Sequence, residues 1–181
     1  MTAARRRQLL RSMFDRMLAH YGPRHWWPAE AAFEMMVGAL LVQNTAWTNV
    51  QKALTRLKTH HAFNPHVLHR LGPDQIAPLI TSAGYFRVKA RRLWHLLDWF
   101  VTRHGATLDH LGPVPTPELR AELLAVHGVG KETADSILLY ALERPIFVVD
   151  AYTRRIFARH GLAPADATYD QLQTLAEKHL P

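Results

Sequence analysis

Residues 123–152 read LLAVHGVGKETADSILLYALERPIFVVDAY. An apolar pattern of helical period runs into a pair of glycines, a second helical pattern follows, and the stretch ends on a carboxylate behind the apolar run 145–149. Two glycines around one apolar residue allow a sharp turn and a close approach of an outside group to the backbone. The stretch therefore predicts two helices joined by a tight turn, with Asp150 held beyond them.

The rest of the chain shows the same alternation of short helical periods and breaks. Apolar residues recur at helical spacing in 9–18, 33–41, 50–57, 93–100, 119–126, 134–142, 152–158 and 172–176, and glycine or proline separates most of these segments. Only residues 146–149 resemble a strand, and one short run makes no sheet. We therefore expect an all-α protein of about eight to ten short helices.

Composition narrows the class of partner. The 181 residues hold 22 Lys and Arg against 15 Asp and Glu, a formal charge of +7, which favours a polyanion, nucleic acid before membrane. No cysteine is present, so no thiolate site is expected within these residues, and the twelve histidines lack the helical pairing that zinc prefers. The N-terminus has no sustained apolar stretch, so we expect neither a signal peptide nor a membrane helix. The lack of cysteine fits a cytoplasmic protein, and we expect a monomer.

The glycine turn has chemistry of its own. Unpaired N–H groups at the start of the second helix suit a phosphate oxygen, and Lys131 stands beside them to add positive charge. Val129, between the glycines, is expected to plug the turn into the core. An ordinary turn between helices would read the same, so the tetrapeptide alone leaves both interpretations open.

Further along, the pattern resembles a known family. The turn, Thr133 and Asp150 resemble the helix-hairpin-helix and aspartate loop of the endonuclease III-like DNA glycosylases. GALLVQNTAWTNVQKAL (38–54) resembles the family's segment with a DNA-inserting glutamine, and SAGYFRVKARRL (82–93) its wedge loop. The resemblance implies that Asp150 is catalytic. It also implies a set of DNA-binding residues: Gln43, Tyr85, Lys89, His127, Gly128, Val129, Gly130, Lys131 and Thr133.

One departure from the family pattern concerns strand cleavage. Bifunctional members carry a lysine after the hairpin that attacks the sugar C1′, and this position holds Glu132 here. A carboxylate cannot form the Schiff base that β-elimination requires. Lys131 is one position away, about 100° around a helix, and is expected to face phosphate. The chain therefore resembles a monofunctional enzyme that uses water as nucleophile, with weak or absent AP-lyase activity.

A second departure concerns the substrate. Trp26, Trp27 and Pro28, together with Trp47, resemble the base pocket of the family's 3-methyladenine DNA glycosylases. Aromatic faces bind a flipped base by stacking, more strongly when alkylation makes the base cationic. Paired tryptophans are also common core residues, so one of Trp26 and Trp27 is expected in the core, and which one faces the pocket stays open.

The predicted function is base excision repair of double-stranded DNA: the enzyme flips a damaged, 3-methyladenine-like base and releases it by hydrolysis. Asp150 would stabilise the cationic sugar and accept a proton from water. Three alternatives stay open. They are a bifunctional endonuclease III-type glycosylase and AP lyase, a mismatch glycosylase, and a non-catalytic helix-hairpin-helix DNA-binding protein.

The resemblance also implies an architecture of two helical lobes with DNA in the cleft between them. Residues 26–124 would form a helical barrel, 1–25 with 135–181 a second lobe, and 119–142 the hairpin at the junction. Family members usually continue beyond the point where this chain stops, so we expect a truncated chain or a reduced variant. No cofactor is expected within it; a [4Fe-4S] cluster would require cysteines past Pro181. The family also allows a monovalent cation at the hairpin.

Overall fold

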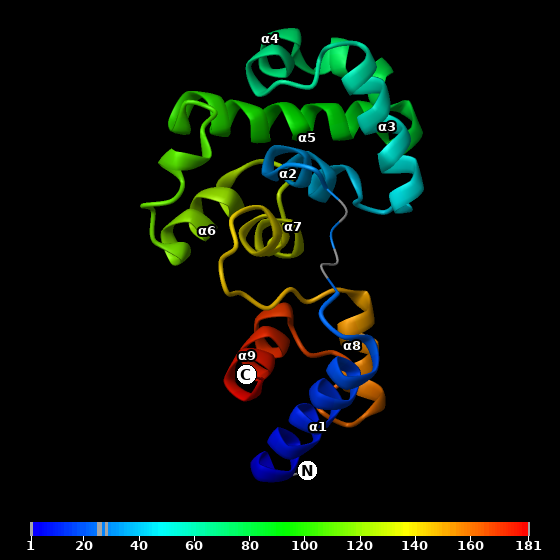
Figure 1. Cartoon of the computed structure of the whole chain (residues 1–181), viewed down its shortest axis with the longest axis vertical. Coiled ribbons are helices and arrows are strands. Elements are labelled where there is room, and N and C mark those ends of the chain that lie inside the picture. The colour runs from blue at the N-terminus through cyan, green and yellow to red at the C-terminus, as the bar shows by residue number, and fades with distance from the viewer. Residues whose placement is uncertain (1, 25–26, 28, 181) are drawn as a thin grey trace. The chain divides into compact units, whose positions relative to one another are not determined.

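The computed structural model describes residues 2–24, 27 and 29–180 (Figure 1). Every regular element in these ranges is a helix, and no strand occurs among them, which confirms the all-α prediction. None of the described helices is both long and apolar enough to cross a membrane. Residues Trp26 and Pro28, two of the predicted pocket residues, lie outside the described residues.

The chain divides into two compact units. One contains Ala29–Arg144, and the other contains Met1–Pro28 with Pro145–Pro181. The division differs from the expected one, because residues 135–144 group with the central unit. The physical reason is packing: the helix after the glycine turn lies against the central helix of that unit.

The larger unit, Ala29–Arg144, is built around an apolar central helix, α2 (Ala32–Leu41). Eight consecutive residues of α2, 34–41, are buried, and all but Glu34 are apolar, so other helices surround α2. Those that contact it are α3 (Trp47–Thr59), α5 (Phe86–Asp98), α7 (Lys131–Ser136) and the π-helical turn η4 (Ile137–Ala141) that continues α7.

Three of the remaining helices of this unit pack onto α5, the long green helix of Figure 1, and one packs onto α7. Asn64 caps α4 (Pro65–Ile76), which starts with a proline at its first position and bends at Gly72, as its glycine and proline predict. The others are η1 (Ala77–Ala83), η2 (Trp99–Arg103), η3 (Leu108–His110) and α6 (Thr116–Ala125), of which α6 packs on α7.

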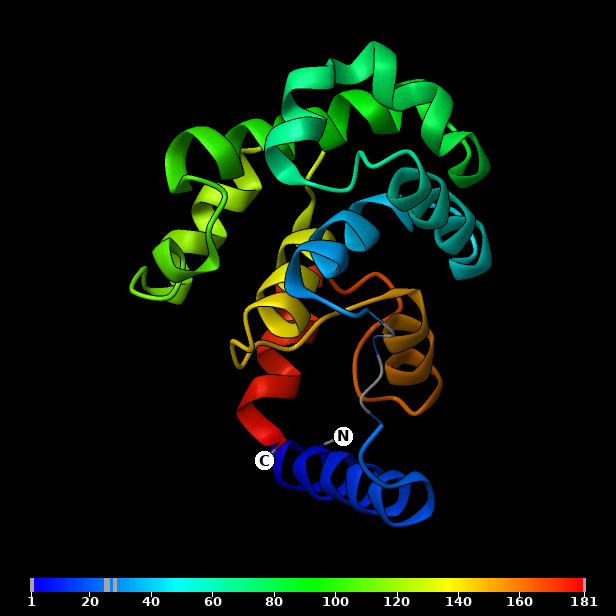
Figure 2. The same cartoon turned by 45° about the horizontal axis from the view of Figure 1, so that its top comes forward.

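The smaller unit contains three described helices, α1 (Ala3–Tyr21), α8 (Ala151–Arg159) and α9 (Tyr169–His179). Their apolar faces share a core with the extended segment that precedes α8. Its fully or nearly buried members are Leu10, Val149, Phe157, Leu162, Ala167, Leu172 and Ala176. Figure 2 shows the C-terminal end of α9 beside α1, where Arg11 Nε donates to the His179 carbonyl at 3.3 Å.

Candidate functional site

The glycine turn lies between α6 and α7, as predicted, and its two glycines serve different needs. Gly128 has φ +90°, and a Cβ there would lie 2.2 Å from Cγ of Arg92. Gly130 has an ordinary φ of −94°, and among the described residues no atom lies within 4 Å of a Cβ built there. Gly128 is therefore required inside the protein, whereas the bare backbone at Gly130 faces open space. Val129 between them is buried, which confirms that it plugs the turn into the core.

Gln43 lies in the turn after α2 and ties that turn to the hairpin. Its Nε2 donates to the Gly128 carbonyl at 3.1 Å and to Thr133 Oγ1 at 3.0 Å, and its Oε1 accepts from Arg92 Nη1 at 2.8 Å. Thr133 is buried. Insertion of Gln43 into DNA, which stays a prediction, would exchange these three hydrogen bonds for contacts with DNA.

Lys89, which is predicted to contact DNA, is buried in this structure. Its side chain is only 2 % exposed, and Nζ donates to the Leu41 carbonyl at 2.8 Å and the Ala83 carbonyl at 2.7 Å. Burial lowers the pKa of Lys89, and the positive charge of Arg92 lowers it further. The lysine, which lies on α5, instead ties the ends of α2 and η1 to α5. The sequence did not predict this burial, because a lysine in a basic segment reads the same whether it is exposed or buried.

Tyr85, the predicted wedge residue, stands out from the surface. Its side chain is 76 % exposed, and the residue has φ +45°, a left-handed conformation uncommon for a residue with a side chain. Gly84 before it also has positive φ, so the chain turns sharply immediately before α5. An exposed aromatic ring on such a turn fits the predicted wedge.

The first turn of α7 carries the two residues on which the prediction of hydrolysis without strand cleavage rests. Lys131 and Glu132 are its first two residues, and both are exposed, as is His127 on the other side of the turn. Glu132 therefore presents a carboxylate where the resemblance places a lysine. The adjacent Lys131 cannot take the same direction, because neighbouring helical residues point about 100° apart.

Asp150 is the N-cap of α8. Its Oδ1 accepts hydrogen bonds from Thr153 N–H at 2.7 Å and Thr153 Oγ1 at 2.8 Å. Val149 before it is buried at 1 % exposure, whereas residues 146–148 are half-buried, so only the last residue of the apolar run is fully in the core. The run forms no helix and pairs with no strand among the described residues. The aspartate is thus held by a buried neighbour on one side and its helix on the other.

The aromatic pocket residues are only partly described. Trp27 and Trp47 are both half-buried, and Trp47 is the first residue of α3, four positions after Gln43. Their role in a base pocket stays a prediction.

Sequence reasoning missed the ion pair that fixes the hairpin's two helices. Asp135 is fully buried on α7, and Arg120 of α6 donates to both of its oxygens, at 2.6 Å from Nε and 3.1 Å from Nη2. A carboxylate inside the otherwise apolar stretch after Thr133 was the signal available, because buried acids almost always have a partner.

A second carboxylate with little exposure, Glu122, lies beside a hollow of about 330 Å³ that His127 also lines. Burial opposes its charge, but hydrogen bonds from Trp99 and His104 and the charge of Arg103 outweigh burial, so the pKa of Glu122 lies below its ordinary value. These neighbours stabilise the charged carboxylate, which is typical of an acid that supports the fold.

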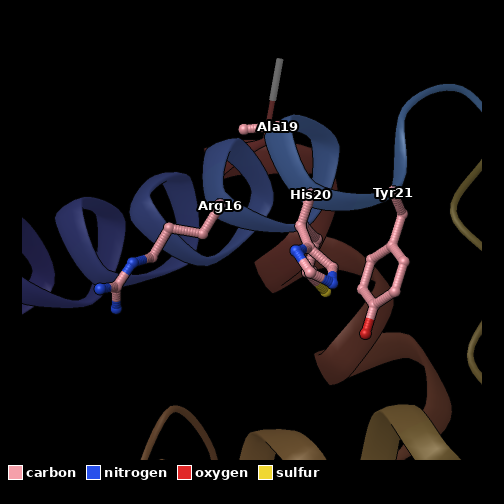
Figure 3. Close-up of a pocket in the computed structure, with 5 residues that line it drawn as sticks. Arg16, Ala19, His20 and Tyr21 are labelled. Carbon is pink, nitrogen blue, oxygen red and sulfur yellow. The ribbon is translucent and has the colours of Figure 1, made fainter.

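A shallow hollow on α1 involves none of the predicted residues. Figure 3 shows that Arg16, His20 and Tyr21 point to the same side of the helix there. The rings of His20 and Tyr21 meet edge to face at 4.5 Å. Nothing in this hollow resembles a reactive group arrangement.

Comparison with known proteins supplies the family. Residues 37–181 match the model of the HhH-GPD superfamily of base excision DNA repair proteins. The chain belongs to this family. It is 43 % identical over 175 residues to the protein named "Putative DNA repair glycosylase MJ1434" from Methanocaldococcus jannaschii, covering 96 % of this chain and 80 % of that one. DNA is therefore its partner and a DNA glycosylase its class.

Two further relatives bear on subtype. Endonuclease III of Thermotoga maritima is 28 % identical over 149 residues, and the match covers 82 % of this chain but only 65 % of that protein. The crystal structure of H. pylori 3-methyladenine DNA glycosylase (MagIII) bound to 1,N6-ethenoadenine matches 97 % of this chain and 81 % of its own with TM-score 0.80 and 28 % identity. The chain is thus similar both to an endonuclease III and to a 3-methyladenine DNA glycosylase.

Proposed function

We propose that this protein is a monofunctional DNA glycosylase that hydrolyses the glycosidic bond of an alkylated, 3-methyladenine-like base. The observation that carries the proposal is the hydrogen bonding of the Asp150 carboxylate. Both of its hydrogen bonds from Thr153 fall on Oδ1, and among the described residues no hydrogen bond reaches Oδ2. One oxygen orients the carboxylate while the other is available to a sugar or a water.

The chemistry needs one carboxylate. An N3-alkylated purine is cationic, so the glycosidic bond breaks with both electrons moving to the base, which leaves neutral. The sugar then carries the positive charge at C1′, which an ionised Asp150 stabilises electrostatically. Water adds to C1′ and its proton passes to the same carboxylate, which acts as general base.

The lysines near the hairpin support hydrolysis over β-elimination. A lyase needs a neutral amine that reaches C1′. Lys89 has a lowered pKa, but its Nζ is buried and already donates to two carbonyls, so it cannot attack a sugar from this position. Glu132 stands at the position where the bifunctional family members have their lysine.

The aromatic residues support an alkylated substrate. Trp27 and Trp47 are half-buried, and a tryptophan face attracts a cationic base more than a neutral one. The H. pylori protein that shares the fold at 28 % identity is named a 3-methyladenine DNA glycosylase, and its ligand is 1,N6-ethenoadenine. We carry the substrate class of alkylated purines over to this chain on that basis.

The exposed glycine turn supports a phosphate contact for the hairpin. Open space outside Gly130 allows a phosphate to approach the backbone, and the exposed Lys131 adds charge there. Each phosphate that a basic residue neutralises releases counterions, so DNA affinity should fall steeply with salt.

The test is release of free bases from methylated DNA, measured by chromatography, beside substrates with uracil, thymine glycol or a mismatch. We expect the wild type to release 3-methyladenine and Asp150→Asn to lose about 10²- to 10⁴-fold in rate. Asparagine still accepts from Thr153 N–H as an N-cap, so the variant should keep its fold and DNA affinity.

Three results would overturn the proposal or its substrate. Unchanged base release by Asp150→Asn would exclude the carboxylate mechanism. A covalent adduct between the wild type and abasic-site DNA after borohydride reduction would show that a lysine acts as nucleophile and that the enzyme is bifunctional. Release of thymine glycol or a mismatched base without 3-methyladenine would reassign the substrate.

A further inference from the structure

The extended segment ahead of the candidate catalytic aspartate has backbone groups that no strand satisfies. Side chains of α9 satisfy three of these groups. Phe147 N–H donates to Glu177 Oε1 at 2.9 Å, and Gln173 Nε2 donates back to the Phe147 carbonyl at 2.8 Å. Val149 N–H donates to Tyr169 Oη at 3.3 Å. Three side chains of one helix thus hold two alternate residues of the extended segment.

The spacing of both partners explains why one helix can do this. Tyr169, Gln173 and Glu177 recur every four residues, so they lie on one face of α9 and rise about 6 Å from one to the next. Alternate residues of an extended chain rise by about 6.6 Å and direct their N–H groups to one side. The two repeats nearly match, and the order is reversed: Phe147 meets the later helical residues and Val149 the earliest.

Side chains fix the depth of the segment, while the hydrogen bonds fix its register along the chain. Val149 is buried, and the ring of Phe147 stacks on Phe157 with centroids 6.4 Å apart. Gln173 is 9 % exposed, so water competes weakly for its hydrogen bond. Apolar packing alone tolerates small sliding, because it is not directional. A directional hydrogen bond does not.

We propose that Tyr169, Gln173 and Glu177, here named the α9 ladder, are positioning residues that set the place of the Asp150 carboxylate. The inference rests on the proposed function, since it assigns the ladder to the residue that carries the reaction. Asp150 follows Val149 directly, and its other side is fixed by Thr153. A shift of the segment along α9 therefore moves the carboxylate relative to C1′. A misplacement of about 1 Å can cost about 10²-fold in rate.

The first experiment tests the ladder in solution by amide hydrogen exchange of the full chain, followed by NMR. Exchange of the Phe147 amide should be slow in the wild type, faster in Glu177→Ala and slow again in Glu177→Gln, because the amide oxygen of glutamine still accepts. Tyr169→Phe should speed exchange of the Val149 amide alone. Unchanged exchange in Glu177→Ala and Tyr169→Phe would show that the hydrogen bonds do not form and would overturn the proposal.

The second experiment measures base release from methylated DNA in a single turnover with enzyme in excess, well below the unfolding temperature of each variant. Gln173→Met keeps the length and loses the donor, and we expect its rate to fall roughly 10- to 100-fold. Glu177→Ala should fall less, and Glu177→Gln should recover most of that loss. Affinity for an abasic-site duplex should stay within about 2-fold, since no ladder residue is assigned a DNA contact. Thr174→Ala, an exposed change on the same helix, is the control.

A merely structural role would lower the unfolding temperature but leave the single-turnover rate of the folded enzyme intact, and that outcome would overturn the proposal. If Gln173→Met does not fold, the same comparison of rate and unfolding temperature is made with Glu177→Ala, Glu177→Gln and Tyr169→Phe. Failure of the proposed function has a different signature, in which Asp150→Asn itself still releases bases. If Asp150→Asn loses activity while every ladder variant keeps full activity, the ladder proposal is overturned and the proposed function stands.

Discussion

The side chain of Arg92 fills the space beside Gly128: a Cβ on the glycine would lie 2.2, 2.5 and 2.8 Å from Cγ, Cδ and Cβ of the arginine. The same arginine donates to Gln43, which donates to the Gly128 carbonyl. The hairpin is therefore held against α5 and the α2–α3 turn by one closed set of contacts. Its shape depends on residues distant in the sequence as well as on its own glycines.

Gly128→Ala should destabilise the protein and Gly130→Ala should not. Alanine at position 128 meets both a left-handed φ and the arginine, costs of about 1–2 kcal/mol and about 1–3 kcal/mol. Position 130 has neither problem. Urea unfolding of both variants measures this difference. Adding Arg92→Ala to Gly128→Ala should recover part of the loss, and strict additivity would contradict the contact.

Glu132→Lys should give the protein AP-lyase activity, that is, cleavage of the strand at an abasic site. The substitution puts an amine at the second position of α7, where the bifunctional family members have it, and C1′ of an abasic site would then form a Schiff base with it. Borohydride should trap the variant on abasic-site DNA and leave the wild type free. Glu132→Gln, which removes the charge without adding an amine, is the control. Equal trapping of the control would point to a different lysine.

The hairpin was predictable from sequence because its determinants are local. A glycine with positive φ, an apolar residue that plugs the turn, and helical periods on both sides all lie within a few residues of one another. The aspartate at the start of α8 was equally readable, since aspartate is a favoured N-cap.

What the sequence could not reveal depends on contacts between distant residues. Gln43 and Gly128 are 85 positions apart, and nothing local indicates that the amide is already bonded to the hairpin. Lys89 resembled one more surface cation, yet two carbonyls bury its ammonium. The spacing of the α9 ladder is visible in the sequence, but its partner segment is not.

Lys89 should make stability depend on alkaline pH. Burial lowers its pKa below the ordinary 10.5, so between the folded-state pKa and 10.5 the unfolded chain binds more protons than the folded one. The unfolding free energy therefore rises with pH through that window, and below it the full cost of the buried charge is present. Urea unfolding from about pH 7 to about pH 10 should show this rise relative to Lys89→Met, which cannot titrate. A difference between the two proteins that stays constant with pH would contradict the buried ammonium.

Tyr85 should matter for damaged DNA but little for folding. Its ring is 76 % exposed, so Tyr85→Ala removes few contacts within the protein. Tyr85→Gly should stabilise the chain slightly, because glycine adopts φ +45° without strain. If the ring stacks on bases as a wedge, both variants should bind a duplex with a damaged base about 10- to 100-fold more weakly, and Tyr85→Phe should not. Fluorescence of 2-aminopurine beside the lesion reports extrusion directly. Loss of extrusion in Tyr85→Phe would assign the effect to the hydroxyl, and full extrusion in both Tyr85→Ala and Tyr85→Gly would exclude a wedge at this position.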